Sequence, residues 1–198
     1  MEELTPGIRH WSARHPNIGW EVSSYWLPDL KVLLDPLEVP DEVTGVEEII
    51  LSNRHHRRSA FEARERFGAV LRVPRTGMHD YSADDPVEPY EYGEPLAGGA
   101  ITAHLVTDLW PDDGVLHIPS LDALEIADTV LNYRDELALV PENLMGDDPE
   151  ADRQGIVRGL DRLSAELDFK HLLFAHGDPI VGGGAAALRA FVERQDGR

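Results

Sequence analysis

The chain has 198 residues, 42% of them hydrophobic and 28% charged, which predicts a single globular domain over residues 1–198. Its formal net charge of −19 predicts repulsion from phosphate groups, so we expect neither nucleic acid nor a membrane as a partner. The absence of cysteine excludes thiolate-held metal or redox centres. With no membrane-length apolar run and no amino-terminal signal, we expect a cytoplasmic protein.

The first half of the chain predicts short strands around one helix. The pattern places strands over 18–27, 30–35, 46–51 and 69–73, and a helix over 59–67. Ser59 and Glu62 have the spacing of a capping box at the helix start, and Gly68 suits the position after its end. Strand, helix and strand in this order predict a parallel βαβ unit.

The second half predicts a hairpin, a long helix and a final strand–helix pair. We expect strands over 100–109, 115–118, 123–127 and 171–175, with helices over 151–167 and from the glycine run at 182–184 to Val192. Residues 74–100 predict loop with an edge strand or two. Residues 129–149 show no clear period, and a lid or an interface is the interpretation we give them.

Three of the apolar strands end in polar residues suited to metal binding or acid–base chemistry. The strand at 46–51 leads into the cluster 53–58, the hairpin strand ends at Asp128, and the last strand ends at His176. Ligands of layered α/β proteins bind where strands end and helices begin. The sequence therefore predicts one crevice that these three segments share.

The order of these elements resembles the metallo-β-lactamase superfamily over essentially the whole chain. That family has the motifs T-H-x-H-x-D-H, P-G-H, G-D-T and G-H-G in this order. The matching stretches here are SNRHHRR at 52–58, PDD at 111–113, ADT at 127–129 and AHGDP at 175–179. The resemblance implies an α+β fold, a four-layer αββα sandwich of two mixed β-sheets flanked by helices.

The chain departs from the family at most metal-ligand positions. The residues in place of family ligands are Asn53, Arg57, Arg58 and Asp113, and the retained ones are His55, Asp128 and His176. The family divides those three between two zinc ions, so neither ion keeps its usual set. Because zinc needs about three protein ligands, we do not expect a dinuclear centre. His56 falls at a variable position of the motif, where we expect surface or supporting placement.

Loss of the metal charge would leave Asp128 as an unpaired carboxylate in the crevice, which is unfavourable. Arg57 or Arg58 is the partner that the sequence suggests, because a guanidinium matches a carboxylate with two parallel hydrogen bonds. We therefore expect an arginine at the vacated metal position.

Three functions compete on this basis. The first is a crevice without a cofactor that binds a small anionic ligand, with Asn53, His56, Arg57, Arg58 and Asp113 as its ligand-binding residues. The second is a hydrolase of an ester, thioester or phosphodiester, with one zinc, iron or manganese ion on His55, Asp128 and His176 as catalytic residues. The third is a structural domain that forms a homodimer through 129–149.

Overall fold

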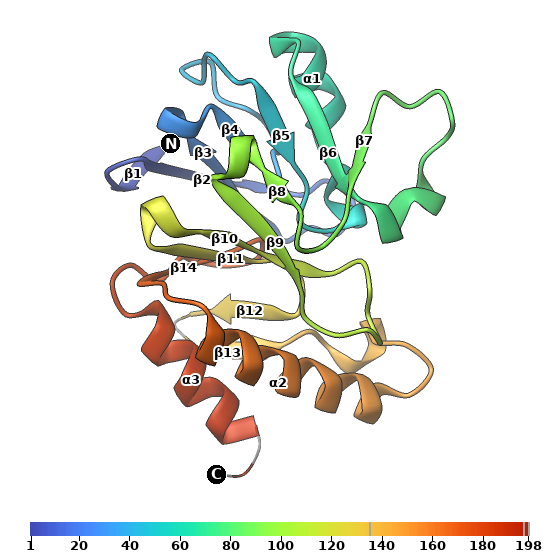
Figure 1. Ribbon diagram of the computed structural model, residues 1–198, viewed down its shortest axis with the longest axis vertical. Coiled ribbons are helices and arrows are strands. Elements are labelled where there is room, and N and C mark those ends of the chain that lie inside the picture. The colour runs from blue at the N-terminus through green and yellow to red at the C-terminus, as the bar shows by residue number, and fades with distance from the viewer. Residues whose placement is uncertain (135, 196, 198) are drawn as a thin grey trace.

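The computed structural model describes residues 1–134, 136–195 and 197, and its elements lie in four layers (Figure 1). The first sheet holds β1 (Glu2–Thr5), β2 (Ile8–Arg14), β3 (Glu21–Leu27), β4 (Val32–Leu34), β5 (Glu48–Ile50), β6 (Val70–Pro74) and β7 (Glu88–Tyr90), in that order. The second has the order β14 (His171–Phe174), β11 (Ala123–Ile126), β10 (Gly114–Ile118), β9 (Ile101–Leu105) and β8 (Pro95–Leu96).

Both sheets are mixed. In the first, β4 to β7 run parallel and β1 to β4 antiparallel; in the second, β14 is parallel to β11 and the others are antiparallel. Helix α1 (Ala60–Phe67) covers the outer face of the first sheet, and α2 (Pro149–Glu166) and α3 (Gly184–Gln195) lie outside the second (Figure 1). The four-layer αββα prediction is confirmed.

The three largest apolar cores among the described residues hold the layers together. One lies between the sheets and includes Tyr25, Leu34, Ile50 and Leu116. A second fills the space between α1 and the first sheet, and a third joins α2 and α3 to the second sheet. Because both faces of the central strands are buried, these strands are apolar runs rather than alternating ones.

The predicted βαβ unit is confirmed, with β5 and β6 parallel and α1 between them. Gly68 ends α1 in the left-handed region at φ 67°, as predicted. The capping-box prediction is wrong, since the Ser59 side chain makes no capping bond to α1. Its Oγ instead accepts a hydrogen bond from the backbone N–H of Glu38 at 3.2 Å.

Two strand pairings were not predicted from the sequence. Strand β2 pairs with β3 from Arg9 to Arg14, and residues 129–149 contain the hairpin β12 (Val130–Tyr133) and β13 (Glu136–Leu139). This hairpin packs against the α2 side of the second sheet (Figure 1). Asp135, within the interface predicted at 129–149, lies outside the described residues. The homodimer through this segment stays a prediction.

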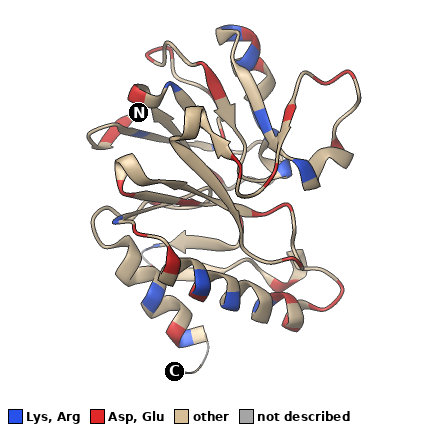
Figure 2. Ribbon diagram, viewed as in Figure 1, with Lys and Arg blue, Asp and Glu red and all other residues tan. Residues whose placement is uncertain are grey.

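Charged residues lie at intervals along α2 and over the loops of both halves (Figure 2). Among the described residues, no helix combines the length and apolar character needed to cross a membrane.

Candidate metal centre

The candidate site lies where the strands of the two sheets end. Asp35 follows β4, a short 3-10 helix at Arg54–Arg57 follows β5, Asp128 follows β11 and His176 follows β14. Because β4 and β5 are parallel neighbours, as are β11 and β14, their carboxyl ends meet at the same edge. The predicted crevice therefore forms from segments far apart in the sequence.

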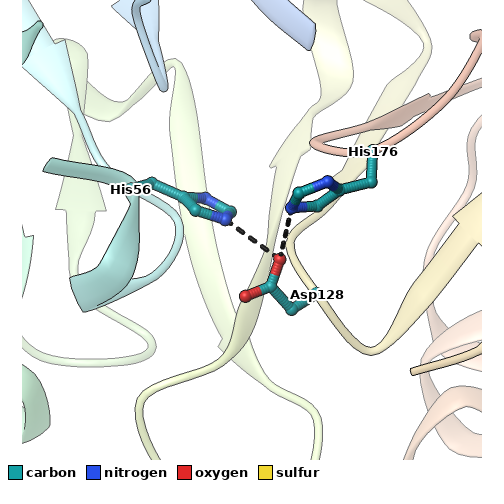
Figure 3. A group of neighbouring side chains, drawn as sticks. All are labelled: His56, Asp128 and His176. Carbon is teal, nitrogen blue, oxygen red and sulfur yellow. Dashed lines mark hydrogen bonds and ion pairs between the residues drawn. The ribbon is translucent and has the colours of Figure 1, made fainter. Parts of the chain in front are cut away.

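Two imidazoles converge on one carboxylate oxygen at the centre of this crevice (Figure 3). Nε2 of His56 and Nε2 of His176 each lie 3.0 Å from Oδ1 of Asp128. One ligand atom from each of these three residues lies within 4.8 Å of the other two. His56 is buried, whereas 13% of the His176 side chain and 20% of the Asp128 side chain are exposed. The cluster is thus fixed on one side and open on the other.

Asp35 holds His56 from behind. Its Oδ2 lies 2.8 Å from Nδ1 of His56, and its carboxylate also accepts hydrogen bonds from the backbone N–H and the hydroxyl of Ser52. Burial disfavours a charged imidazole, but the carboxylates of Asp35 and Asp128 outweigh it and raise the pKa of His56 to about 10. The two carboxylates on either side of His56 thus favour its protonated form.

Burial alone would raise the pKa of the Asp128 carboxyl, yet the charge and hydrogen bonds of His56 and His176 hold it well below its usual range. These imidazoles are its partners in the described part of the chain, so the predicted ion pair of Asp128 with Arg57 or Arg58 is wrong. Arg57 points away: half of its side chain is exposed, and its guanidinium stacks on Phe61 at 4.1 Å.

Arg58 binds backbone carbonyls instead of a carboxylate. Its Nη1 donates to the carbonyls of Ser23 at 2.8 Å and Asp35 at 2.9 Å, and its Nη2 donates to that of Ala175 at 3.4 Å. Burial lowers the pKa of this guanidinium, and Asp35 and Asp128 oppose that effect. Arg58 thus joins the ends of β3, β4 and β14, and its φ of 33° is strained for a residue other than glycine.

Asn53 and Asp113 bind each other on the opposite side of Asp128. The amide of Asn53 donates to Oδ1 of Asp113 at 2.8 Å, and both residues are buried. Asp113 also accepts the backbone N–H of Asp128 at 2.9 Å and that of Thr129 at 3.0 Å. Burial and the nearby Asp128 charge raise the pKa of Asp113 to about 7. These residues fasten the loop that carries Asp128.

Ser23 fastens the backbone on both sides of His176. Its N–H donates to the carbonyl of Ala175 at 2.9 Å, and its hydroxyl donates to that of Gly177 at 2.9 Å. Nε2 of the buried His10 lies 3.1 Å from the same hydroxyl. Gly177 itself has φ 100°, and a Cβ there would lie 1.8 Å from the carbonyl oxygen of Asn132. The position of His176 is therefore set by β3 as well as by its own strand.

The cluster opens into a cavity of about 720 Å³. Its polar lining consists of His15, Arg54, His55, His56, Arg58, Asp128, Asn143 and His176. The apolar lining consists of Ile18, Trp20, Val22, Trp110, Leu131, Val140, Pro141 and Leu144. A cavity of this size suits a small organic ligand.

The structure brings His56, rather than His55, to Asp128 and His176. His55 is exposed at the cavity wall, and its backbone N–H donates to the Asn53 side chain at 2.8 Å. Asp35, which was not among the predicted site residues, also belongs to the site. A signal existed for it, because an acidic residue ends a strand next to the strand that carries the histidines. The spacing of the residues, however, does not show whether His55 or His56 points to Asp128, because this depends on the conformation of the 3-10 turn.

This architecture and the position of the cluster at the strand ends define a metallo-β-lactamase fold, as the motif resemblance implied. A rubredoxin oxygen:oxidoreductase from Desulfovibrio gigas is similar, with TM-score 0.71, 17% identity, and coverage of 98% of this chain and 61% of that one. This chain thus spans less than two thirds of that protein's length.

Two further solved structures match over most of both chains. An archaeal metallo-β-lactamase superfamily protein from Sulfolobus tokodaii matches with TM-score 0.73, 14% identity, and coverage of 95% of this chain and 85% of that one. A metallo-β-lactamase from Pontibacter korlensis matches with TM-score 0.67, 14% identity, and coverage of 100% and 98%. Neither a family model nor a curated protein sequence matches the chain.

The cluster fits a single metal ion by the chemistry of its donors. Two imidazole nitrogens and one carboxylate are a common ligand set for catalytic zinc and for iron, and they leave positions open to the cavity. Asp35 on the far nitrogen of His56 matches the carboxylate–histidine pairs that orient metal ligands. The expectation that the crevice takes no cofactor therefore loses its main support.

Proposed function

We propose that the protein is a mononuclear metal-dependent hydrolase with His56, Asp128 and His176 as its ligands. The convergence of both Nε2 atoms on one oxygen of Asp128 carries this proposal. It retains the predicted hydrolase, with His56 in the place given to His55. A divalent ion bound there would polarise an ester, thioester or phosphodiester bond and lower the pKa of the attacking water.

The surrounding residues have separate tasks in this proposal. Asp35 accepts the proton on Nδ1 of His56 and so keeps Nε2 directed at the open side. Arg58 on the cavity wall is bound by backbone carbonyls rather than by a carboxylate, so its charge favours the negative charge that develops during hydrolysis. On the other side, the Asn53–Asp113 pair occupies two positions that the family resemblance assigns to ligands of a second ion, which supports one ion rather than two.

Metal analysis of two matched histidine variants tests the proposal. His56→Ala is expected to weaken zinc or manganese binding at least roughly 100-fold and to remove hydrolysis, because the metal loses one of three ligands. His55→Ala, one residue away and exposed, is expected to retain the metal. Metal below about 0.1 equivalent in the unmodified protein after incubation with each ion would refute a metal enzyme.

A metal-free anion-binding protein is the second candidate. It is favoured by the cavity lining, where Asp128 is the only carboxylate that the described residues contribute, among several arginine and histidine side chains. A thermal-shift screen with small carboxylates and phosphates tests it, since a ligand that binds only the folded state raises the melting temperature. This reading predicts a shift in chelator-treated protein that Arg58→Ala abolishes.

A further inference from the structure

The mouth of the cavity is apolar although the protein carries a net charge of −19. Ile18, Trp20 and Leu144 line it, and 53%, 39% and 56% of these residues, respectively, are exposed to solvent. Tyr133, 54% exposed, extends the patch through an edge contact with Trp20, at 6.1 Å between ring centroids. Exposed apolar residues that gather around one cavity mark a binding surface.

This apolar surface begins next to the metal cluster. The ring of Trp20 lies edge-on to the ring of His176, with 6.4 Å between their centroids. Deeper in the same wall are Val22, Leu131 and Val140, which are buried. A substrate whose reacting bond lies at the cluster would therefore have its apolar part attached within a few atoms of that bond.

The floor of the cavity has the opposite character. Its polar side chains are mainly the N–H-bearing groups of His15, Arg54, His55, His56, Arg58 and His176. Carboxylates compensate two of them, because Arg54 pairs with Asp80 and Asp112, and His56 with Asp35. An apolar wall that meets a floor rich in N–H groups suits a molecule with an apolar arm and an electron-rich end. A fatty or aromatic carboxylate has this form, and so does the ester from which it is released.

Resting on the hydrolase proposed above, we propose that the substrates are esters or thioesters of medium-length apolar acyl groups. The acyl chain lies along Trp20, Ile18 and Leu144, and the carbonyl lies at the cluster. Water adds its oxygen to the acyl carbon, and the bond from that carbon to the alcohol oxygen or thiol sulfur breaks. One proton from the water goes to the leaving alcohol or thiol, the other is released to solvent, and the carboxylate product remains on the floor of the cavity.

Binding of product carboxylates tests the apolar site without catalysis. Acetate, hexanoate and octanoate would be titrated into the full chain by calorimetry, once with zinc and once with chelator. Each buried methylene strengthens binding by about fourfold, equivalent to about 0.8 kcal/mol. Octanoate is therefore expected to bind at least roughly tenfold more tightly than acetate, allowing for partial exposure at the mouth.

Two exposed positions give a matched pair of variants. Trp20→Ala is expected to weaken octanoate binding about tenfold and to leave acetate binding unchanged, because only the longer chain reaches the aromatic wall. Val181→Ala, which removes apolar surface that is 49% exposed and does not line the cavity, is expected to change neither. Equal affinity for the three acids, or equal effects of both variants, would overturn the inference.

The acyl preference should also appear in kinetics. With p-nitrophenyl acetate, hexanoate and octanoate, kcat/KM is expected to rise with chain length, and Trp20→Ala should flatten that series. A flat series in the unmodified, metal-loaded protein would overturn the inference. The metal analysis of His56→Ala separately decides the hydrolase proposal, so failure of the ester site and failure of the metal site give different results.

Discussion

The two sides of the crevice each stabilise a carboxylate, but with different partners. On one side, Asp113 is buried and satisfied by three N–H donors, from the Asn53 side chain and the backbone of Asp128 and Thr129. On the other side, Asp128 is partly exposed and satisfied by two imidazoles. The Asp113 carboxylate stabilises the fold, whereas the Asp128 carboxylate presents an oxygen to the cavity.

This difference indicates which contacts a bound ligand can replace. Backbone N–H groups cannot leave Asp113 without unfolding the loop, so an ion has no access to that carboxylate. The contacts of the two imidazoles with Asp128 can be replaced by a metal ion, because imidazole nitrogens and a carboxylate oxygen are metal ligands. Chemistry is therefore expected on the Asp128 side and stability on the Asp113 side.

The largest effect is expected from Asp128→Ala. Loss of the shared oxygen leaves two imidazoles without their common partner, so metal affinity and hydrolysis should each fall by roughly 1,000-fold or more. Metal content after dialysis and initial rates measure this loss. Retained metal in this variant would show that the ion binds elsewhere.

Asp113→Ala should produce the opposite profile. Three hydrogen bonds are lost and two buried N–H groups are left near Asp128, which is expected to cost about 3 kcal/mol of folding free energy. Urea unfolding measures the loss, while metal stoichiometry in the still-folded fraction is expected to stay at one ion per chain. A change in metal stoichiometry without a loss of stability would contradict the view that Asp113 stabilises the fold and Asp128 binds the metal.

Glu125 lies in β11, fully buried, and neither of its carboxyl oxygens has a hydrogen-bond partner among the described residues. Burial, reinforced by the charge of Asp35, raises its pKa well above the ordinary value. A raised pKa in the folded state means that its contribution to stability is present below the unfolded pKa of 4.5 and is lost as pH rises.

Glu125→Met removes this titration and keeps an apolar side chain of similar length. The variant is expected to be about 2 kcal/mol more stable than the unmodified protein near neutral pH, with a smaller gain at pH 4. Urea unfolding at both pH values gives the comparison. A gain that does not change with pH would mean that Glu125 does not titrate on folding in this range.

The smallest effect is expected at Ser23. Ser23→Ala removes the hydroxyl that holds the Gly177 carbonyl beside His176, so metal affinity should fall about tenfold, as for other residues that orient metal ligands. The absorption spectrum of the cobalt-substituted protein should also change, because the geometry at His176 relaxes. Ser164→Ala, a buried serine on α2, serves as the control and is expected to leave both unchanged.

Chain order and apolar periodicity were sufficient to predict the βαβ unit, the β10–β11 hairpin, α2 and the polar strand ends at Asp128 and His176. The same signals could not find β12 and β13, because a short hairpin depends on pairing across strands rather than on a local pattern. They also could not assign Asp35 to the site, since an acidic residue before a proline equally describes a turn.

The sequence by itself therefore determined the order of the elements and which residues follow the strands, because burial periodicity and turn chemistry are local properties. Only the tertiary structure decided that His56, rather than its neighbour His55, meets Asp128 and His176, that Arg58 binds carbonyls, and that Asn53 and Asp113 pair. Adjacent side chains of a 3-10 turn point in different directions, and which of them enters the crevice depends on β4, β11 and β14 packed around it.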